Sequence, residues 1–228
     1  MSSPSDPVPV TPECPRCSAP VARLASDAVV EPRGATHACP EHGATRALRR
    51  APEVSYDGFA RHLLATADAF PTLLPWPLSP GWRVTDFASV GGADAPTAAT
   101  LTSVAGSSQL DGPVDLTVVV EEPGTGLGAR CAGLGHTDPW RGLGAHAPLV
   151  RVRVGRSSVP LWPVSTAALD GDLDRSVVAG EAGGRWLWLV VRPASAILLL
   201  RDDWILRDVS GVGPPLVELP FGGPGPRW

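Results

Sequence analysis

Lysine is absent from the 228-residue sequence, so its 19 permanently charged basic side chains are all arginine. Arginine holds phosphate and carboxylate groups with a planar fork of donors. A GC-rich coding bias explains the same choice, together with the abundance of Ala, Gly, Pro, Val and Leu. The formal net charge of −4 lacks the positive excess that attracts a protein to nucleic acid or to an anionic membrane. Composition alone therefore favours neither of these partners.

Long apolar runs are also missing. No stretch approaches the roughly 20 apolar residues that a membrane-spanning helix needs, and residues 1–13 lack the basic start and apolar centre of a secretory signal. Cysteine is scarce: three of the four cysteines belong to one pair of motifs, and Cys131 has no obvious mate. This usage suits a reducing compartment better than a disulfide-linked exterior, so we expect a cytoplasmic protein without a membrane segment.

What the chain does contain favours short elements. Its 25 glycines and 26 prolines argue against long uninterrupted helices and predict many loops. The apolar share of 43% is sufficient for a hydrophobic core, and the length allows one ordinary domain with a smaller one attached.

Two short motifs carry the strongest chemical signal. Cys14 and Cys17 form a C-P-R-C motif, and Cys39 and His42 form a C-P-E-H motif downstream, whereas His37 lacks this spacing. Three thiolates and one imidazole make a set typical of tetrahedral zinc, so we predict Zn²⁺ as the cofactor, bound by these four residues. The alternatives are two unrelated turns, or a redox pair at Cys14 and Cys17. A redox pair needs a thioredoxin-like βαβ context, which the flanking sequence does not offer.

The predicted fold class is α+β, mostly β: an N-terminal zinc ribbon followed by a predominantly antiparallel β-sheet domain with one or two short helices. The ribbon is too small to bury much surface, so the metal must supply much of its stability. The predicted segments are a disordered lead-in at 1–13, the zinc ribbon at 14–50, a linker with a short helix and a Pro/Trp strap at 51–80, the β-rich domain at 81–213, and a Pro/Gly-rich tail at 214–228.

From residue 81 onward, short apolar and β-branched segments alternate with turn residues. Most spacers are too short for the crossovers of a parallel sheet, which need about a dozen residues, so antiparallel pairing is expected. The segments predicted as strands are 82–90, 98–104, 114–121, 150–154, 159–164, 177–181, 186–192, 197–201 and 204–209.

The linker predicts one helix and one extended strap. Over residues 57–70, Phe59, Leu63 and Phe70 fall on one face at helical spacing, with Asp57 as the N-cap. The following segment, 71–82, is rich in proline and tryptophan. We interpret it as a strap anchored on the core by its tryptophans, with a polyproline ligand for an aromatic groove as the alternative.

A glycine-rich loop after a predicted strand is a second candidate site. Residues 124–129, which include Gly124, Gly126 and Gly128, fit a G-x-G-x-x-A pattern that ends at Ala129, and Arg130 follows where it could hold an anion. A dinucleotide site needs a full helix, a second parallel strand and an acidic residue about 20 positions on, whereas the next predicted strand carries arginines. The remaining interpretations are an anion- or ligand-binding loop at these four residues and a glycine loop that packs tightly on the sheet.

Other chemical patterns are weaker. The segment 170–181 spaces its acids like a calcium loop, but Arg175 replaces the required glycine and the flanks predict strands. Cys131 has His136 nearby in sequence, yet a lone cysteine in an apolar run is usually a small buried hydrophobe. Glu121 and Glu122 are adjacent in a predicted strand, so they face opposite sides and do not share a site. The sequence therefore offers no convincing catalytic set.

Several further segments have a distinctive order. After the two cysteine motifs come PWPLSPGW at 75–82, EEPGTGLGAR at 121–130, PLWPVS at 160–165, AGEA at 179–182 and WLW at 186–188. In this order they resemble an uncharacterised family of small zinc-ribbon-headed proteins from high-GC Gram-positive bacteria. The resemblance implies the same zinc-headed, strand-rich layout and a cytoplasmic setting, and it implies no activity. Residues 50–70 depart from the family pattern, so the helix predicted there rests on periodicity alone.

Three functional hypotheses follow. The first is a non-catalytic zinc-binding module with an interaction or regulatory role, acting through a partner protein. The alternative is a small-ligand-binding protein or enzyme with its site at the loop 124–130, near His136 and Asp138. The second alternative is a nucleic-acid-associated zinc ribbon that uses the small basic cluster at 46–50, although a near-neutral module binds phosphates poorly. Nucleic acid is thus the least favoured partner, and the sequence leaves the oligomeric state open.

Overall fold

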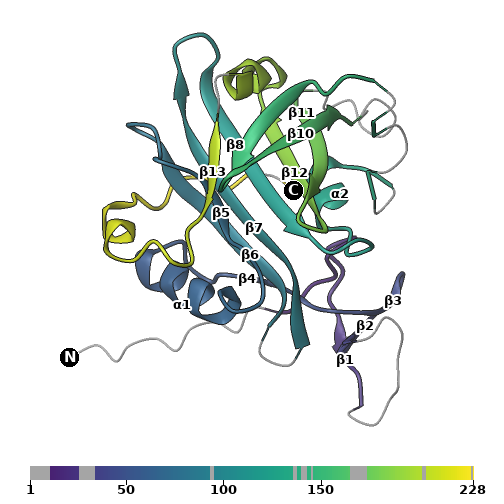
Figure 1. Ribbon diagram of the computed structural model, residues 1–228. Coiled ribbons are helices and arrows are strands. Elements are labelled where there is room, and N and C mark those ends of the chain that lie inside the picture. Colours follow the sequence, from purple (N-terminus) through teal and green to yellow (C-terminus); the bar gives the residue numbers. More distant parts are fainter. Residues whose placement is uncertain are drawn as a thin grey trace, which may run out of the picture.

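The computed structural model describes residues 11–25, 34–92, 95–135, 138–139, 143–144, 146–164, 174–201, 204–226 and 228. The described part is mostly β, and its strands pair antiparallel except for one parallel pair. They form a three-stranded and a ten-stranded sheet, accompanied by a few short helices (Figure 1). The predicted α+β, mostly β fold class is therefore confirmed.

The small sheet carries the cysteine motifs. β1 (Ala22–Arg23), β2 (His37–Cys39) and β3 (Gly43–Thr45) pair antiparallel in that order. The chain then enters β4 (Leu48–Arg50), which pairs with the large sheet. Glu13 and Leu48 exchange two backbone hydrogen bonds, of 3.2 and 2.8 Å, so the segment before the first motif is attached to β4. The predicted division of the chain into segments at residues 13, 50, 80 and 213 stays a prediction, and residues 1–10 of the predicted lead-in lie outside the described residues.

The large sheet has the order β4-β6-β7-β8-β12-β11-β10-β9-β13-β5. Most of the predicted strands are present, with slightly shifted bounds. Side chains alternate between the two faces of each strand. In β8, for example, Val118 and Val120 face one core and Val119 faces the other. The strands are β5 (Leu73–Pro75), β6 (Arg83–Gly92), β7 (Ala95–Ser108), β8 (Gly112–Glu121), β9 (Val150–Val154), β10 (Ser157–Pro163), β11 (Ser176–Ala182), β12 (Arg185–Arg192) and β13 (Ile205–Asp208).

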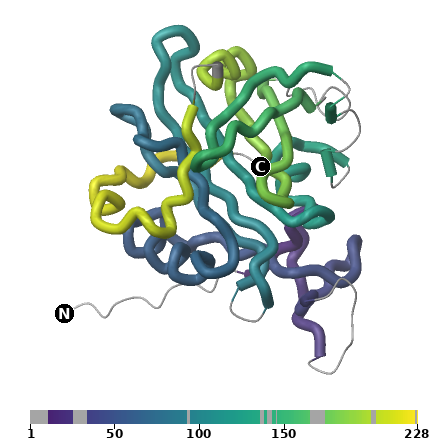
Figure 2. The backbone as a smooth tube through the Cα atoms, viewed as in Figure 1, coloured from purple at the N-terminus to yellow at the C-terminus, as the bar shows by residue number. Residues whose placement is uncertain are grey.

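The far end of this sheet folds back over its middle, as the backbone trace in Figure 2 shows. Thr100 and Thr102 of β7 each donate a 2.6 Å hydrogen bond, to the carbonyls of Pro71 and Leu73 at the start of β5. The apolar side chains enclosed between β5 and the middle strands form the larger core. The two edges of the sheet are β4 and β5, two strands that were not predicted from the sequence.

A second core lies on the opposite face of the middle strands, beneath α2 (Leu127–Ala132). Trp188 of β12 is fully buried there. The backbone of Gly128 lies directly against this ring, since a Cβ at that position would be 2.2 Å from Trp188 Cδ1. A side chain at 128 would therefore force the helix away from the sheet, which explains the glycine.

Two predictions, one of a helix and one of a strand, were wrong in detail. α1 (Tyr56–Thr66) is shorter than predicted, and its N-cap is Ser55 instead of Asp57, because the Ser55 hydroxyl accepts a 3.2 Å hydrogen bond from Gly58 N. The segment 197–201, predicted as a strand, lies in a 3-10 helix, η1 (Ala194–Arg201). A short apolar run does not distinguish a buried strand from a buried helix by periodicity. Here Ala196 and Leu200 are fully buried in the core, and Ile197 and Leu199 pack partly against it.

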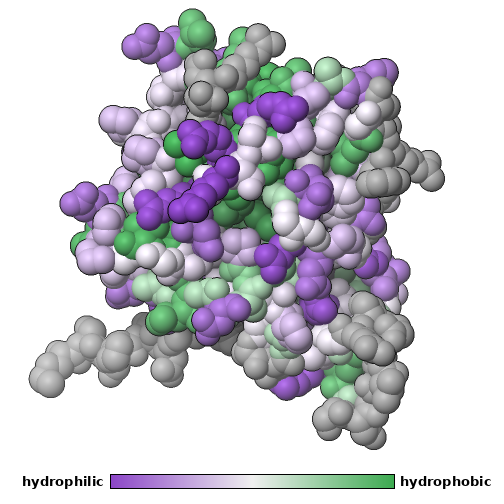
Figure 3. Space-filling model, viewed as in Figure 1, coloured by the Kyte–Doolittle hydropathy of each residue, from purple (hydrophilic) through white to green (hydrophobic). Residues whose placement is uncertain are grey.

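The C-terminal segment lies along the large sheet. η2 (Pro214–Glu218) precedes Pro220, whose carbonyl accepts a 2.9 Å hydrogen bond from Val84 N. The guanidinium of Arg50 lies over the Trp228 ring, 3.6 Å from its centroid. On the face drawn in Figure 3, hydrophobic side chains are interspersed with hydrophilic ones. Within the described residues, no helix has the length and apolar character needed to cross a membrane.

Candidate metal centre

The two cysteine motifs meet in space. The ligand atoms of Cys14, Cys17, Cys39 and His42 all lie within 4.8 Å of one another. Cys17 Sγ is 3.6 Å from Cys39 Sγ, and His42 Nδ1 is 3.8 Å from Cys14 Sγ and 3.6 Å from Cys39 Sγ. His37 is outside this group, and its Nδ1 lies 2.9 Å from the hydroxyl of Thr36.

These separations fit one tetrahedral zinc ion. Bonds of about 2.3 Å to sulfur and 2.0–2.1 Å to nitrogen, at tetrahedral angles, place two sulfurs about 3.8 Å apart and a sulfur about 3.6 Å from a nitrogen. The observed Sγ–Sγ and Sγ–Nδ1 distances, 3.6 to 3.8 Å, agree with both values. The four side chains can therefore hold a metal ion with little rearrangement, in a set consistent with zinc.

Tight turns position both ligand pairs. In the first turn, Ser18 N donates to the Cys14 carbonyl at 3.2 Å, and Arg16 N points at Cys14 Sγ at 3.5 Å. Ser18 adopts a left-handed φ of 62° that ends the turn. The second pair lies where β2 passes into β3: Cys39 pairs with Gly43, which also has a left-handed φ, of 68°, and His42 is in the turn between them.

The thiols have unequal acidities. Burial raises the pKa of Cys14 and raises that of Cys17 to about 12. Burial also acts to raise the pKa of Cys39, but hydrogen bonds from the His42 ring and from the backbone N–H groups of Glu41 and His42 lower it to about 6. Three thiolates crowded at these distances need a cation to stabilise them, and a divalent metal supplies that charge.

Two arginines join this centre to the large sheet. Arg130 of α2 donates hydrogen bonds of 2.9 Å to the Cys14 carbonyl and to the Glu13 carboxylate. Arg16, inside the first ligand turn, donates to the carbonyls of Gly124 at 2.6 Å and Thr125 at 3.4 Å. The loop after β8 therefore packs directly against the metal-binding turn.

The proposed ligand loop has its glycines in structural positions. Gly124 and Gly126 have left-handed φ values of 82° and 84°, and Gly126 is the N-cap of α2. Gly128 contacts Trp188, and Arg130 has the Glu13 carboxylate as its counter-ion. An anion- or cofactor-binding role for Gly124, Gly126, Gly128 and Arg130 stays a prediction.

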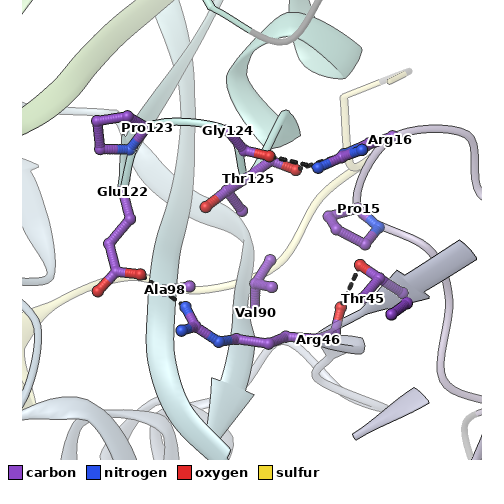
Figure 4. A pocket seen from close by; sticks show the side chains of 11 residues that line it. Pro15, Arg16, Thr45, Arg46, Val90, Ala98, Glu122, Pro123, Gly124 and Thr125 are labelled. Atoms are coloured by element: carbon purple, nitrogen blue, oxygen red, sulfur yellow. Dashed lines mark hydrogen bonds and ion pairs between the residues drawn. The ribbon is translucent and has the colours of Figure 1, made fainter. Parts of the chain in front are cut away.

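A cavity of about 280 Å³ separates the cysteine-bearing turns from the loop after β8 (Figure 4). Arg46 and Glu122 close one side with a 2.6 Å ion pair between Nη1 and Oε2. No sequence pattern predicted this cavity, because its walls come from five separate stretches of chain. They are formed by Pro15, Arg16, Ala44, Thr45, Arg46, Val90, Ala98, Glu122, Pro123, Gly124 and Thr125.

Glu121 at the end of β8 and Cys131 in α2 are two buried titratable residues. Glu121 is fully buried and its carboxyl group accepts a 2.8 Å hydrogen bond from Leu127 N, whereas Glu122 pairs with Arg46. Burial raises the pKa of Glu121 to about 8. Burial likewise raises the pKa of the Cys131 thiol well above its usual range, so this thiol is a poor nucleophile.

Two sequence candidates fall wholly or partly outside the described residues. His136 lies there, whereas Asp138 is described and accepts hydrogen bonds from Gly124 N at 2.9 Å and Trp186 Nε1 at 3.1 Å. Residues 170–173 of the calcium-like segment 170–181 are also outside, whereas 174–181 are described and Glu181 accepts a 2.6 Å hydrogen bond from Gly184 N.

Fold and site together define a mostly β protein that carries a Cys₃His cluster capable of holding a metal ion. Residues 8–228 match the model of a family of unknown function (DUF6758), and the chain belongs to this family. No curated protein and no solved structure matches the chain. The expected resemblance to an uncharacterised family is thus confirmed at the level of family membership.

Proposed function

We propose that this protein is a non-catalytic zinc-binding module with an interaction or regulatory role, acting in the cytoplasm through a partner protein. The observation that supports it best is the convergence of three thiols and one imidazole within 4.8 Å. Thiolate-rich sets with tetrahedral spacing are typical of zinc. The four protein atoms would fill all four positions of a tetrahedral zinc ion, and a closed set of this kind is structural and does not activate a water molecule.

The ribbon around the centre depends on the metal for its shape. Among the described residues, the small apolar cluster of the ribbon has four buried members, Cys14, Val21, Cys39 and Ala47, and two of these are ligands. So little apolar surface cannot offset the conformational entropy of ordering the segment. Structural zinc contributes apparent binding free energies of about 10 kcal/mol or more to folds of this size.

The position of the ribbon favours a contact role. The β1–β3 sheet projects from the large sheet, at the lower right of Figure 1. Its outer strand, β1, has both residues exposed, as are Glu41 and His42 in the ligand turn. By contrast, two arginines of the basic cluster are engaged within the molecule: Arg46 with Glu122 and Arg50 with Trp228. This arrangement supports a protein partner over a phosphate backbone.

Metal content is the first test. The purified chain should hold one equivalent of zinc by mass spectrometry, and Co²⁺ exchanged into the site should show the visible absorption of tetrahedral thiolate coordination. Cys39→Ser should lower both signals, whereas Cys131→Ala should not. A chain that is folded but free of zinc, and shows no thiolate bands with Co²⁺, would remove the basis of the proposal.

The interaction role needs a separate comparison. Partners captured by the intact chain should be lost with the double substitution Cys14→Ser and Cys17→Ser, and retained with Cys131→Ala. The same partners on all three proteins would show that the ribbon is not the contact surface.

A further inference from the structure

We propose that the cavity between the ribbon and the loop after β8 binds a small organic carboxylate, and that the metal-bound ribbon forms one of its walls. The second half of this statement rests on the proposed zinc-binding function. The cavity, about 280 Å³, is slightly smaller than the roughly 300–1,000 Å³ pockets that hold drug-sized ligands. Its occupant is therefore a small molecule.

The floor of the cavity is apolar. Val90 of β6 and Ala98 of β7 are both buried, 1% exposed each, and they lie behind the charged groups in Figure 4. Pro15 and Pro123 flank them from opposite sides of the cavity. A hydrocarbon group placed here would lose its contact with water, which is favourable by about 25 cal/mol per Å² of apolar area.

The lining has two guanidinium groups and one carboxylate, so one guanidinium has no acidic partner in the lining. Arg46 is paired with the Glu122 carboxylate at 2.6 Å, whereas Arg16 donates only to two neutral carbonyls, those of Gly124 and Thr125. These two bonds occupy Arg16 Nε and Nη2 and hold the guanidinium in place. Within the described residues, Arg16 Nη1 has no protein acceptor, so its two N–H donors remain for a ligand.

This combination selects a carboxylate on an apolar body. Guanidinium groups bind carboxylates through charge-assisted hydrogen bonds, and a guanidinium already fixed in place loses less entropy on binding. A cationic ligand would meet two guanidinium groups and only one carboxylate in the lining. A phosphate dianion would meet about twice the repulsion from the Glu122 carboxylate that a single carboxylate meets, and would leave the apolar floor without a partner.

The cavity depends on the ribbon being folded. Pro15 and Arg16 lie between the ligands Cys14 and Cys17, and 44–46 follow the ligand His42 by two to four positions. If metal loss unfolds these turns, one side of the cavity and its free guanidinium are lost together. Carboxylate binding should therefore require the metal.

The test is an NMR titration of the full zinc-loaded chain with sodium butyrate. The Arg16 Nε–Hε signal and the backbone amides of Val90 and Ala98 should shift and saturate. The same signals should not respond to 1-butanol, which lacks the carboxylate, and should respond less to inorganic phosphate, which lacks the apolar body. Zinc content is measured on each sample.

Two variants and one control locate the binding. Arg16→Gln should weaken butyrate binding at least about tenfold, since a charge-assisted hydrogen bond is lost. Ala44→Leu, which fills the cavity from the partly exposed hairpin, should block it. Arg83→Gln changes an exposed arginine at the opposite end of β6 and should have no effect. Zinc retained at one equivalent shows that each variant is folded at the ribbon.

The outcomes separate the two proposals. Absence of zinc overturns the proposed function, whereas bound zinc without saturable shifts overturns only the carboxylate site. Equal binding of phosphate, or unchanged binding by Arg16→Gln, also overturns it. Binding that persists after zinc is removed with a chelator contradicts the metal-dependent wall.

Discussion

Arg130 connects the metal-binding turn to the large sheet, and we predict that its replacement by alanine weakens zinc binding. Its guanidinium donates 2.9 Å hydrogen bonds to the Cys14 carbonyl and the Glu13 carboxylate, and only 7% of its side chain is exposed. The Trp228 ring centroid lies 4.9 Å from the guanidinium carbon. Arg130→Ala therefore removes a support of the ligand turn and leaves all four ligands in place.

The size of the effect follows from these contacts. Hydrogen bonds to charged groups contribute about 1.5–3 kcal/mol each. The Glu13 side chain is 30% exposed, so solvent screening reduces its share, and we expect a total of about 2–3 kcal/mol. Because the contacts form only with the folded, metal-bound ribbon, this energy should appear as a zinc affinity roughly 25- to 150-fold weaker, at about 1.4 kcal/mol per factor of ten. Residues that support metal ligands elsewhere change affinity by about 10- to 100-fold.

The assay is competition for zinc with a chromogenic chelator, with circular dichroism to confirm that the large sheet is folded. Arg185→Ala is the matched control, because Arg185 also lies over an aromatic ring, Phe70 at 4.2 Å, and donates to a carbonyl, Ala69 O at 3.1 Å. Arg185 belongs to β12, and neither of these two contacts involves the ribbon. The reasoning fails if folded Arg130→Ala binds zinc within about threefold of the parent, or if both variants lose affinity equally.

Three further predictions concern stability, each measured by urea unfolding at 25 °C. Burial lowers the pKa of His62 to about 4, below its ordinary value of about 6.5. The free energy of unfolding should therefore fall by about 3 kcal/mol as the pH drops from 6.5 to 4, and His62→Phe should not show this decrease. A pH-independent difference in stability between the parent and His62→Phe would contradict the prediction. Burial raises the pKa of Glu121 to about 8, so stability should instead decrease as the pH rises from about 4.5 to 8, by at most about 1.4 kcal/mol per pH unit. Glu121→Gln should lack this decrease, and an identical pH profile would refute the assignment. Gly128→Ala should lower the free energy of unfolding by about 1–3 kcal/mol, because the new methyl group overlaps Trp188. Gly211→Ala, which has open space around it, should leave the stability nearly unchanged. Equal stabilities of the two variants would argue against the close contact at Gly128.

Local patterns predicted the parts of this protein that local geometry decides. The metal ligands are three positions apart in each motif, close enough for one turn to present both to a single ion, so Cys14, Cys17, Cys39 and His42 could be found without a fold. The strands followed from short apolar segments between turns. The error at 197–201 arose because four consecutive apolar residues satisfy a strand and a 3-10 helix equally well.

Only the tertiary structure decided which distant segments meet. Arg130 and Glu13 are 117 positions apart, and Arg16 and Gly124 are 108 apart, so no spacing rule connects them. They come together because β4 joins the ribbon to one edge of the large sheet, while β8 delivers the loop 122–125 to the same place. The sequence by itself determined the metal ligands, because the two members of each motif are close neighbours along the chain. The cavity beside them was determined by the strand order, which sequence spacing does not encode.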